Sequence, residues 1–182
     1  MATSTRTPAA EQARTTIQRR IDADVEERSD AFLLYDTYQV ERLARQAFRS
    51  FGVESDGTPN RSQMRKLERV ALSAGTYSEV VNYVKSQAGR ETRGEWRREG
   101  FAYDLHDQLE AVREEAEGRA ATVIDGIERS LVADIQGEDE RKKDAEKRIQ
   151  NWVTHEMRLR FVQRYVGHLT AEYMFVISKE VA

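Results

Sequence analysis

Apolar residues recur every three or four positions along most of this chain, and that spacing restricts the fold more than any other feature of the sequence. The clearest sets are Ala13, Ile17, Ile21 and Val25; Phe101, Leu105, Leu109 and Val112; and Ala120, Ile124, Ile127, Leu131 and Ile135. Because an α-helix turns once in about 3.6 residues, such side chains lie on one helix face. The two prolines, Pro8 and Pro59, both stand where helices could begin. The sequence therefore predicts an all-α fold.

The segment Leu67–Lys85 carries the sharpest local signal, a turn between two helices. Ala74-Gly75 ends the first helix, and Thr76–Glu79 has the pattern of a capping box that starts the second. In such a box the threonine hydroxyl accepts a hydrogen bond from the glutamate amide, and the glutamate side chain reaches back. Asn60–Gln63 predicts a second box by the same pattern. The valines of 79–85 leave a strand as an alternative there, but the cap and the spacing favour a helix.

The first part of the chain is expected to be one long helix or two. Residues 1–7 form a frayed, flexible end. The apolar stripe then runs through 8–51, and Ser29-Asp30 is either a break or a polar turn within one helix. Residues 52–58, GVESDGT, form the clearest loop, since glycine and aspartate precede a proline.

The second half predicts two long helices. One begins near Phe101, is bent or weakened by Gly118, and ends at Gly137. The charge run 138–148 forms the first turns of the last helix, which carries a broad apolar stripe to the C-terminus. These elements together predict a single helical domain over 1–182, a bundle of about five to six helices.

Composition excludes several classes of protein. The chain has no cysteine, so it has neither disulfides nor thiolate metal sites. No apolar run approaches the roughly 18 residues of a membrane span, and the N-terminus has no apolar signal core. We therefore expect a cytoplasmic protein without membrane contact. The net charge of −3 argues against a globally basic nucleic-acid binder, although it does not exclude a local basic patch.

No motif for catalysis or metal binding is recognised. The three histidines, His106, His155 and His168, lack the Glu-x-x-His spacing of di-iron bundles and the second histidine of zincins. Phosphate-binding glycine loops are absent as well. We therefore expect a protein that is not an enzyme and has no cofactor. A small helical hydrolase built around His106-Asp107 is left as a third alternative.

Arginine outnumbers lysine by 23 to 6, which suits phosphate contact, although a GC-rich genome gives the same bias. Three clusters are candidate RNA contacts: Arg90, Arg93, Trp96, Arg97 and Arg98; Arg158, Arg160 and Arg164; and Arg42, Arg45 and Arg49. A tryptophan among arginines fits stacking on an unpaired base. The alternative is that Trp96 belongs to the core and the arginines form solvated ion pairs with the acidic residues between them.

Two stretches resemble the small helical subunit of type III-B CRISPR effector complexes, the Cmr type. Ala74-Gly75 stands where that family has Asn-Gly, and Tyr83-Val84-Lys85 stands near the end of the following helix. The tail Thr170-Ala171-Glu172-Tyr173-Met174, with Lys179 and Ala182, is similar to the closing helix of the family.

This resemblance implies a non-catalytic subunit of an RNA-guided antiviral complex. It would pack against other subunits of a ribonucleoprotein, self-associate head to tail, and contact the RNA backbone without reading sequence. The alternative is a helical structural or interaction protein of another assembly, of viral or mobile-element type, with no nucleic-acid role.

Overall fold

The computed structural model describes residues 8–35, 37–52, 58, 60–90, 94–127 and 142–180. Its α-helices are α1 (Pro8–Tyr35), α2 (Thr37–Phe51), α3 (Ser62–Ser73), α4 (Tyr77–Gly89), α5 (Phe101–Asp125) and α7 (Lys142–Glu180). A short 3-10 turn, η1 (Arg98–Gly100), precedes α5. These ranges hold six α-helices and no strand, so the predicted all-α bundle is confirmed. No helix within them has the length and apolar character to cross a membrane.

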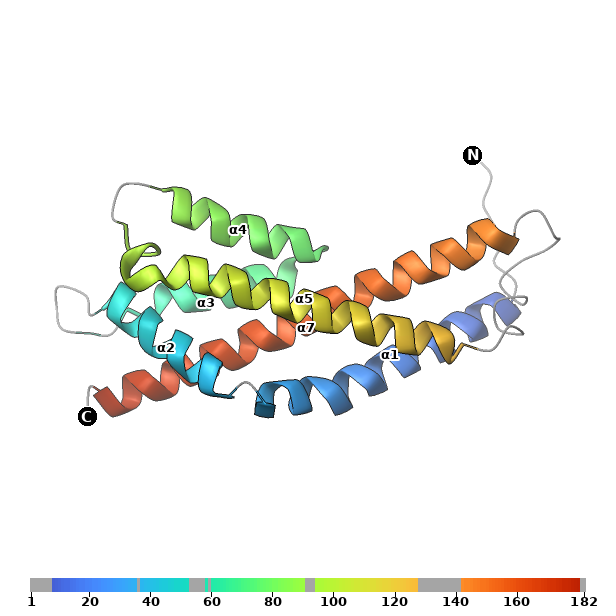
Figure 1. The fold of residues 1–182 in the computed structure, drawn as a ribbon, viewed down its shortest axis with the longest axis horizontal. Helices are drawn as coiled ribbons and strands as arrows, with labels where there is room; N and C mark the ends of the chain where they lie inside the picture. Colours follow the sequence, from blue (N-terminus) through green and yellow to red (C-terminus); the bar gives the residue numbers. More distant parts are fainter. Residues whose placement is uncertain are drawn as a thin grey trace.

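The longest helix, α7, runs the length of the molecule and forms its axis (Figure 1). Its 39 residues span roughly 60 Å at about 1.5 Å per residue. It contacts each of the other five described α-helices. Helices α2, α3 and α4 gather around its C-terminal half, α1 lies along its N-terminal half, and α5 accompanies it through both. The predicted stripe of the last helix thus serves as the surface on which the bundle is assembled.

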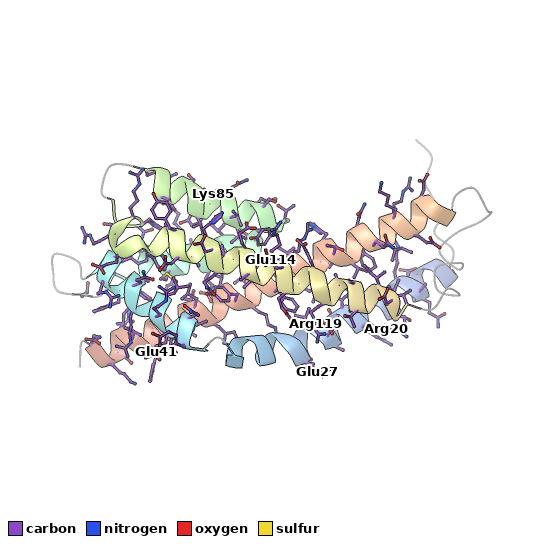
Figure 2. The ribbon with its side chains drawn as sticks, viewed as in Figure 1. Arg20, Glu27, Glu41, Lys85, Glu114 and Arg119 are labelled. Carbon is purple, nitrogen blue, oxygen red and sulfur yellow. The ribbon has the colours of Figure 1, made fainter. Side chains whose placement is uncertain are left out.

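Helix α5 ends at Asp125, so the prediction that it continues to Gly137 is wrong. The Gly126 amide closes the last turn by donating to the carbonyl of Thr122 at 3.1 Å. The Gly126 carbonyl then accepts a hydrogen bond from the guanidinium of Arg20 on α1, which lies beside this helix end in Figure 2. Gly118 lies within the uninterrupted helix. The remainder of the predicted stripe, Leu131, Ile135 and Gly137, lies outside the described residues.

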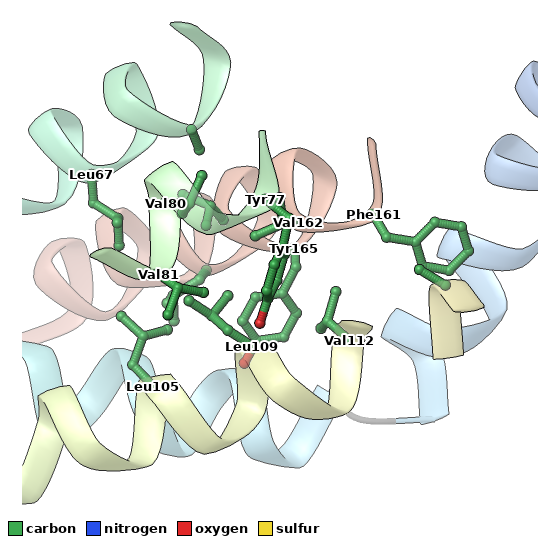
Figure 3. Packing of buried hydrophobic residues seen from close by; sticks show 14 of the residues in the cluster. Leu67, Tyr77, Val80, Val81, Leu105, Leu109, Val112, Phe161, Val162 and Tyr165 are labelled. Atoms are coloured by element: carbon green, nitrogen blue, oxygen red, sulfur yellow. The ribbon is translucent and has the colours of Figure 1, made fainter. Parts of the chain in front are cut away.

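The buried side chains of all six helices form one continuous apolar cluster. Figure 3 shows part of it, where Leu67 of α3, Val80 and Val81 of α4, Leu109 of α5 and Tyr165 of α7 lie among one another. Each of these residues is one of the regularly spaced apolar positions on its helix or a direct neighbour of one. Burying these faces requires the other helices, because a single amphipathic helix leaves its stripe in water.

The predicted capping box between α3 and α4 is confirmed. The Glu79 amide donates to Thr76 Oγ1 at 3.2 Å, and Thr76 has extended backbone angles, as a cap requires. The Glu79 carboxylate reaches back to the amide of Gly75 at 3.1 Å, one residue before the cap. Residues 79–85 are helical, so the strand alternative is wrong.

The segment 8–51 forms two helices, and the break does not fall at Ser29-Asp30. Helix α1 continues through these residues to Tyr35, and α2 begins at Thr37. Of the predicted loop 52–58, residues 53–57 lie outside the described chain, as do the predicted flexible end 1–7 and residues 138–141 of the charge run. Gly52 has a positive φ of 65° and follows α2 directly, which agrees with a helix stop.

The second predicted capping box is wrong in the part assigned to Gln63. Asn60 does hold the start of α3, because its Oδ1 accepts from the amide of Ser62 at 3.2 Å and from its hydroxyl at 2.6 Å. The side chain of Gln63 does not reach back to Asn60. It instead accepts a hydrogen bond from the indole of Trp96 at 3.4 Å, a partner far along the chain.

Replacing Thr76 by alanine should lower the free energy of unfolding by about 1 kcal/mol, because the amide of Glu79 loses its acceptor. Urea unfolding followed by circular dichroism measures this loss. Thr122→Ala is the matched control, since its exposed hydroxyl only donates to the Gly118 carbonyl within α5. The control should change stability by less than about 0.5 kcal/mol. Equal losses in both variants would contradict the role given to the box.

Candidate nucleic-acid interface

Trp96 is a core residue. Its side chain is 4% exposed and packs against Phe51, Tyr83 and Phe101, with ring centroids 5.4, 5.8 and 5.5 Å away. Its indole N–H donates a hydrogen bond to the side-chain oxygen of Gln63. A base cannot reach this ring, so the prediction that Trp96 stacks on RNA is wrong. The other interpretation of the sequence, a buried tryptophan, is the one that the structure shows.

The buried tryptophan anchors a tight turn that carries arginines on its outside. The turn uses left-handed backbone at Gly94 (φ 62°) and Gly100 (φ 78°), a conformation that glycine adopts readily. Three side chains, which we call the turn arginines, are exposed around it: Arg90, Arg97 and Arg98. Arg97 donates to the carbonyl of Ala88 at the end of α4. Arg93 lies outside the described residues.

Few carboxylates neutralise the turn arginines. Glu99, which precedes Gly100, is paired with Arg49 of α2 at 3.4 Å. Within the described part of the chain, no ion pair joins Arg90, Arg97 or Arg98 to an acidic side chain. The turn therefore presents positive charge to solvent.

The arginines of the last helix serve the fold. Arg158 pairs with Glu117 of α5 at 2.9 Å, and Arg160 pairs with Asp22 of α1 at 2.7 Å. These two side chains thus reach different neighbouring helices. Arg164 is half-buried and also interacts within the protein. The structure does not bring this cluster together into one free basic face.

The cluster on α2 is likewise paired. Arg45 forms ion pairs with Glu41 at 2.8 Å and with Glu180 at 3.7 Å. Arg49 forms an ion pair with Glu99. Arg42 donates to Asp104 of α5 at 2.5 Å. Its guanidinium must leave that carboxylate before it can bind a phosphate.

Asp104 is the centre of the contact between α2 and α5. Its Oδ2 accepts from Arg42 at 2.5 Å and from the Gln46 amide at 2.9 Å. Partial burial alone would raise the pKa of Asp104, but the hydrogen bonds from Gln46 and Arg42 and the charge of Arg42 outweigh it and hold the pKa below its usual range. The ionised carboxylate is therefore the form that holds α2 against α5.

A set of arginines that the sequence analysis missed lies at the start of α3 and along it. Arg61, Arg65 and Arg69 follow one another at intervals of four residues and are exposed, so they line one outer face of the helix. No acidic side chain pairs with them in the described ranges. We call them the α3 arginines. The spacing of four could have revealed them, because Glu68 is the single acidic residue within α3.

The turn arginines and the α3 arginines belong to the same end of the bundle. The hydrogen bond from Trp96 to Gln63 joins the turn to the first turn of α3. Figure 1 shows α3, the end of α4 and the beginning of α5 together at that end. This surface, which we call the basic end, carries the exposed arginines that the fold itself does not neutralise.

The histidines do not assemble a metal centre in the described chain. His106 lies 3.5 Å from Asp107 and 3.9 Å from Glu110, and Glu110 also accepts a hydrogen bond from the Tyr77 hydroxyl at 3.2 Å. No group of three or more potential ligands is near enough to hold an ion within those residues.

The basic end can offer guanidinium groups to phosphates. Comparison of the chain with protein families, with curated proteins and with solved structures finds no significant match.

Asp104→Asn should remove an acid-sensitive part of the stability. Because the pKa of Asp104 is lower in the fold than in the unfolded chain, its carboxylate stabilises the protein at neutral pH, and this contribution is lost as the pH falls below about 4. The stability difference between wild type and variant should thus be largest near neutral pH and shrink under acid. Urea unfolding between pH 7 and pH 3 measures it.

Glu114→Gln is the control for this experiment, since Glu114 is exposed on the same helix and has no ion pair in the described chain. Its effect should stay within about 0.5 kcal/mol. A wild-type advantage over Asp104→Asn that does not change with pH would show that the ionised form is not what matters.

Proposed function

We propose that this chain is a non-catalytic helical subunit of a ribonucleoprotein assembly, which packs against neighbouring subunits and contacts the RNA backbone. The observation that carries this proposal is the basic end. There the turn arginines and the α3 arginines are exposed without acidic partners in the described residues. The site acts by binding, and no membrane contact is part of the proposal.

The pairing state of each arginine decides which of them contact RNA. An exposed guanidinium without a carboxylate partner can take a phosphate in a bidentate contact without first breaking an ion pair. Arg42, Arg158 and Arg160 would first have to leave Asp104, Glu117 and Asp22. The proposed interface is therefore narrower than the clusters in the sequence, and it includes α3.

Such contacts bind any sequence. Guanidinium groups on helix and turn surfaces hold phosphates, which are the same in every nucleotide, whereas sequence is read on the edges and faces of bases. Trp96, the tryptophan of the turn, is buried, so it does not offer a stacking platform beside the arginines. Binding should therefore be strongly dependent on salt and nearly independent of sequence.

The assembly that we propose is an RNA-guided antiviral effector complex of the type III-B class in the cytoplasm. The resemblance at Ala74-Gly75, at Tyr83-Val84-Lys85 and in the tail supports it. The confirmed turn between α3 and α4 is compatible with this resemblance. Neighbouring genes for other subunits of such a complex would support the proposal further.

A second candidate is a helical interaction protein without any nucleic-acid role. One observation favours it: seven arginines of α2, α5 and α7 form ion pairs within the described fold, so a high arginine content does not by itself require RNA. If this candidate is right, the protein should bind partner proteins in the absence of RNA and should not bind RNA itself.

Charge reversal at the basic end should weaken RNA binding. We expect Arg97→Glu/Arg98→Glu and Arg65→Glu/Arg69→Glu each to lower the affinity for a fluorescein-labelled single-stranded RNA of mixed sequence. Each lost phosphate contact should make the slope of log K against log salt shallower by about 0.7. Fluorescence anisotropy at several salt concentrations measures both quantities.

The matched control is Arg14→Glu/Arg148→Glu, which changes the net charge equally. Both arginines are exposed near the N-terminal ends of α1 and α7, at the opposite end of the molecule. The control should bind RNA much better than either test variant. Equal losses in all three double variants, or binding by the wild type that does not respond to salt, would contradict the proposed interface.

A further inference from the structure

Helix α2 holds the backbone of the turn that carries the turn arginines. Ser50 of α2 is fully buried, and its hydroxyl donates to the carbonyl of Arg98 at 2.7 Å. Gln46, one helical turn earlier, is 7% exposed, and its side-chain amide donates to the carbonyl of Glu99, also at 2.7 Å. Two buried side chains of one helix thus bind two successive carbonyls of the turn.

These two hydrogen bonds hold a strained backbone in place. Glu99 has a positive φ of 57°, and within the described chain it is the only residue other than glycine with such an angle. A side chain makes this conformation costly, so it persists only where surrounding contacts impose it. The bonds from Ser50 and Gln46 fix the peptide planes on the two sides of Glu99. The conformation of the turn is therefore imposed by α2.

A third contact from α2 concerns charge. Arg49, which precedes Ser50, pairs with the carboxylate of Glu99 at 3.4 Å. Glu99 directly follows Arg98, so its carboxylate is the acidic group of the turn that lies next to a turn arginine in the sequence. The ion pair directs this carboxylate to α2 and leaves Arg98 without an acidic partner in the described residues. We call Gln46, Arg49 and Ser50 the α2 clamp.

The turn has other contacts that keep it folded. Its own backbone closes it, because the amide of Arg98 donates to the Gly94 carbonyl at 3.0 Å and the amide of Gly100 donates to the Arg97 carbonyl at 3.1 Å. Trp96 anchors it in the core. A buried hydroxyl or amide adds little net stability, since it exchanges hydrogen bonds with water for hydrogen bonds within the protein. What the α2 clamp adds is a fixed direction for the backbone that bears Arg97 and Arg98.

We propose that the α2 clamp positions Arg97 and Arg98 for contact with phosphates. A guanidinium on a fixed backbone loses less conformational freedom on binding than one on a mobile turn, so the same contact gives a higher affinity. This inference rests on the RNA contact proposed above and adds positioning residues to it. Gln46 and Ser50 are buried, so they act on RNA only through the turn arginines.

Ser50→Ala is the sharpest test, because the Ser50 hydroxyl donates to the turn and to no second acceptor in the described chain. The variant should bind the fluorescein-labelled single-stranded RNA of mixed sequence up to about fivefold more weakly, since one lost hydrogen bond lowers the population of the binding-competent turn by about that factor. In a protein that carries Arg97→Ala/Arg98→Ala, the same change should alter the affinity by less than about twofold. Fluorescence anisotropy measures all four proteins.

Thr76→Ala is the control for stability. It removes one hydroxyl acceptor from the start of α4, whereas the turn follows the end of that helix. Its RNA affinity should equal that of wild type. Hydrogen exchange followed by NMR reports on the turn without RNA: the Gly100 amide should exchange about fivefold faster in Ser50→Ala and at the wild-type rate in Thr76→Ala.

Four results would overturn the inference. They are equal RNA affinity in wild type and Ser50→Ala, an equal loss in Thr76→Ala, an undiminished effect of Ser50→Ala in the protein without the turn arginines, and an unchanged exchange rate at Gly100. Weaker binding by Arg97→Glu/Arg98→Glu together with any of these results would leave the RNA contact standing without the clamp. Wild-type binding by Arg97→Glu/Arg98→Glu would instead remove the turn from the proposed interface, and the positioning role with it.

Discussion

The burial of α7 is the interaction on which the rest of this fold depends. Its buried side chains are not confined to one narrow seam, because Val153, Phe161 and Val166, spaced eight and five residues apart, point to different sides of the helix. A helix that is apolar over so wide an arc must be surrounded by others, and each of the other described helices packs against it. The short helices α3 and α4 add little helical stability of their own, so they are ordered mainly by this packing.

Ion pairs between helices explain why arginine clusters in this sequence are a poor guide to binding. The partner of Arg42 is Asp104, and that of Arg158 is Glu117; neither carboxylate is near its arginine in the sequence. The pairs are partly exposed, so each contributes modestly, but together they specify which helix faces fit one another. The arginines left over are those for which the packing supplies no carboxylate, and this follows only from the three-dimensional arrangement.

Local patterns predicted local structure well here, and contacts between distant segments account for the failures. The Thr76–Glu79 box could be predicted because its donors and acceptors lie within five residues. The end of α5 could not, since the Gly126 carbonyl is bound by Arg20, which is 106 residues away. The burial of Trp96 depends in the same way on Phe51 and Gln63. The α3 arginines were within reach of sequence analysis, because their spacing of four residues is a local pattern.

The position of α7 in the chain has a consequence for biosynthesis. The helix that completes the core leaves the ribosome after the other described helices, since it occupies Lys142–Glu180. At roughly 5–20 residues per second, the earlier helices would wait several seconds with their apolar faces open to water. The nascent chain is thus a natural client for chaperones during that interval. Folding is completed by an element distant in sequence from most of its contacts, which favours slow, late closure over stepwise folding from the N-terminus.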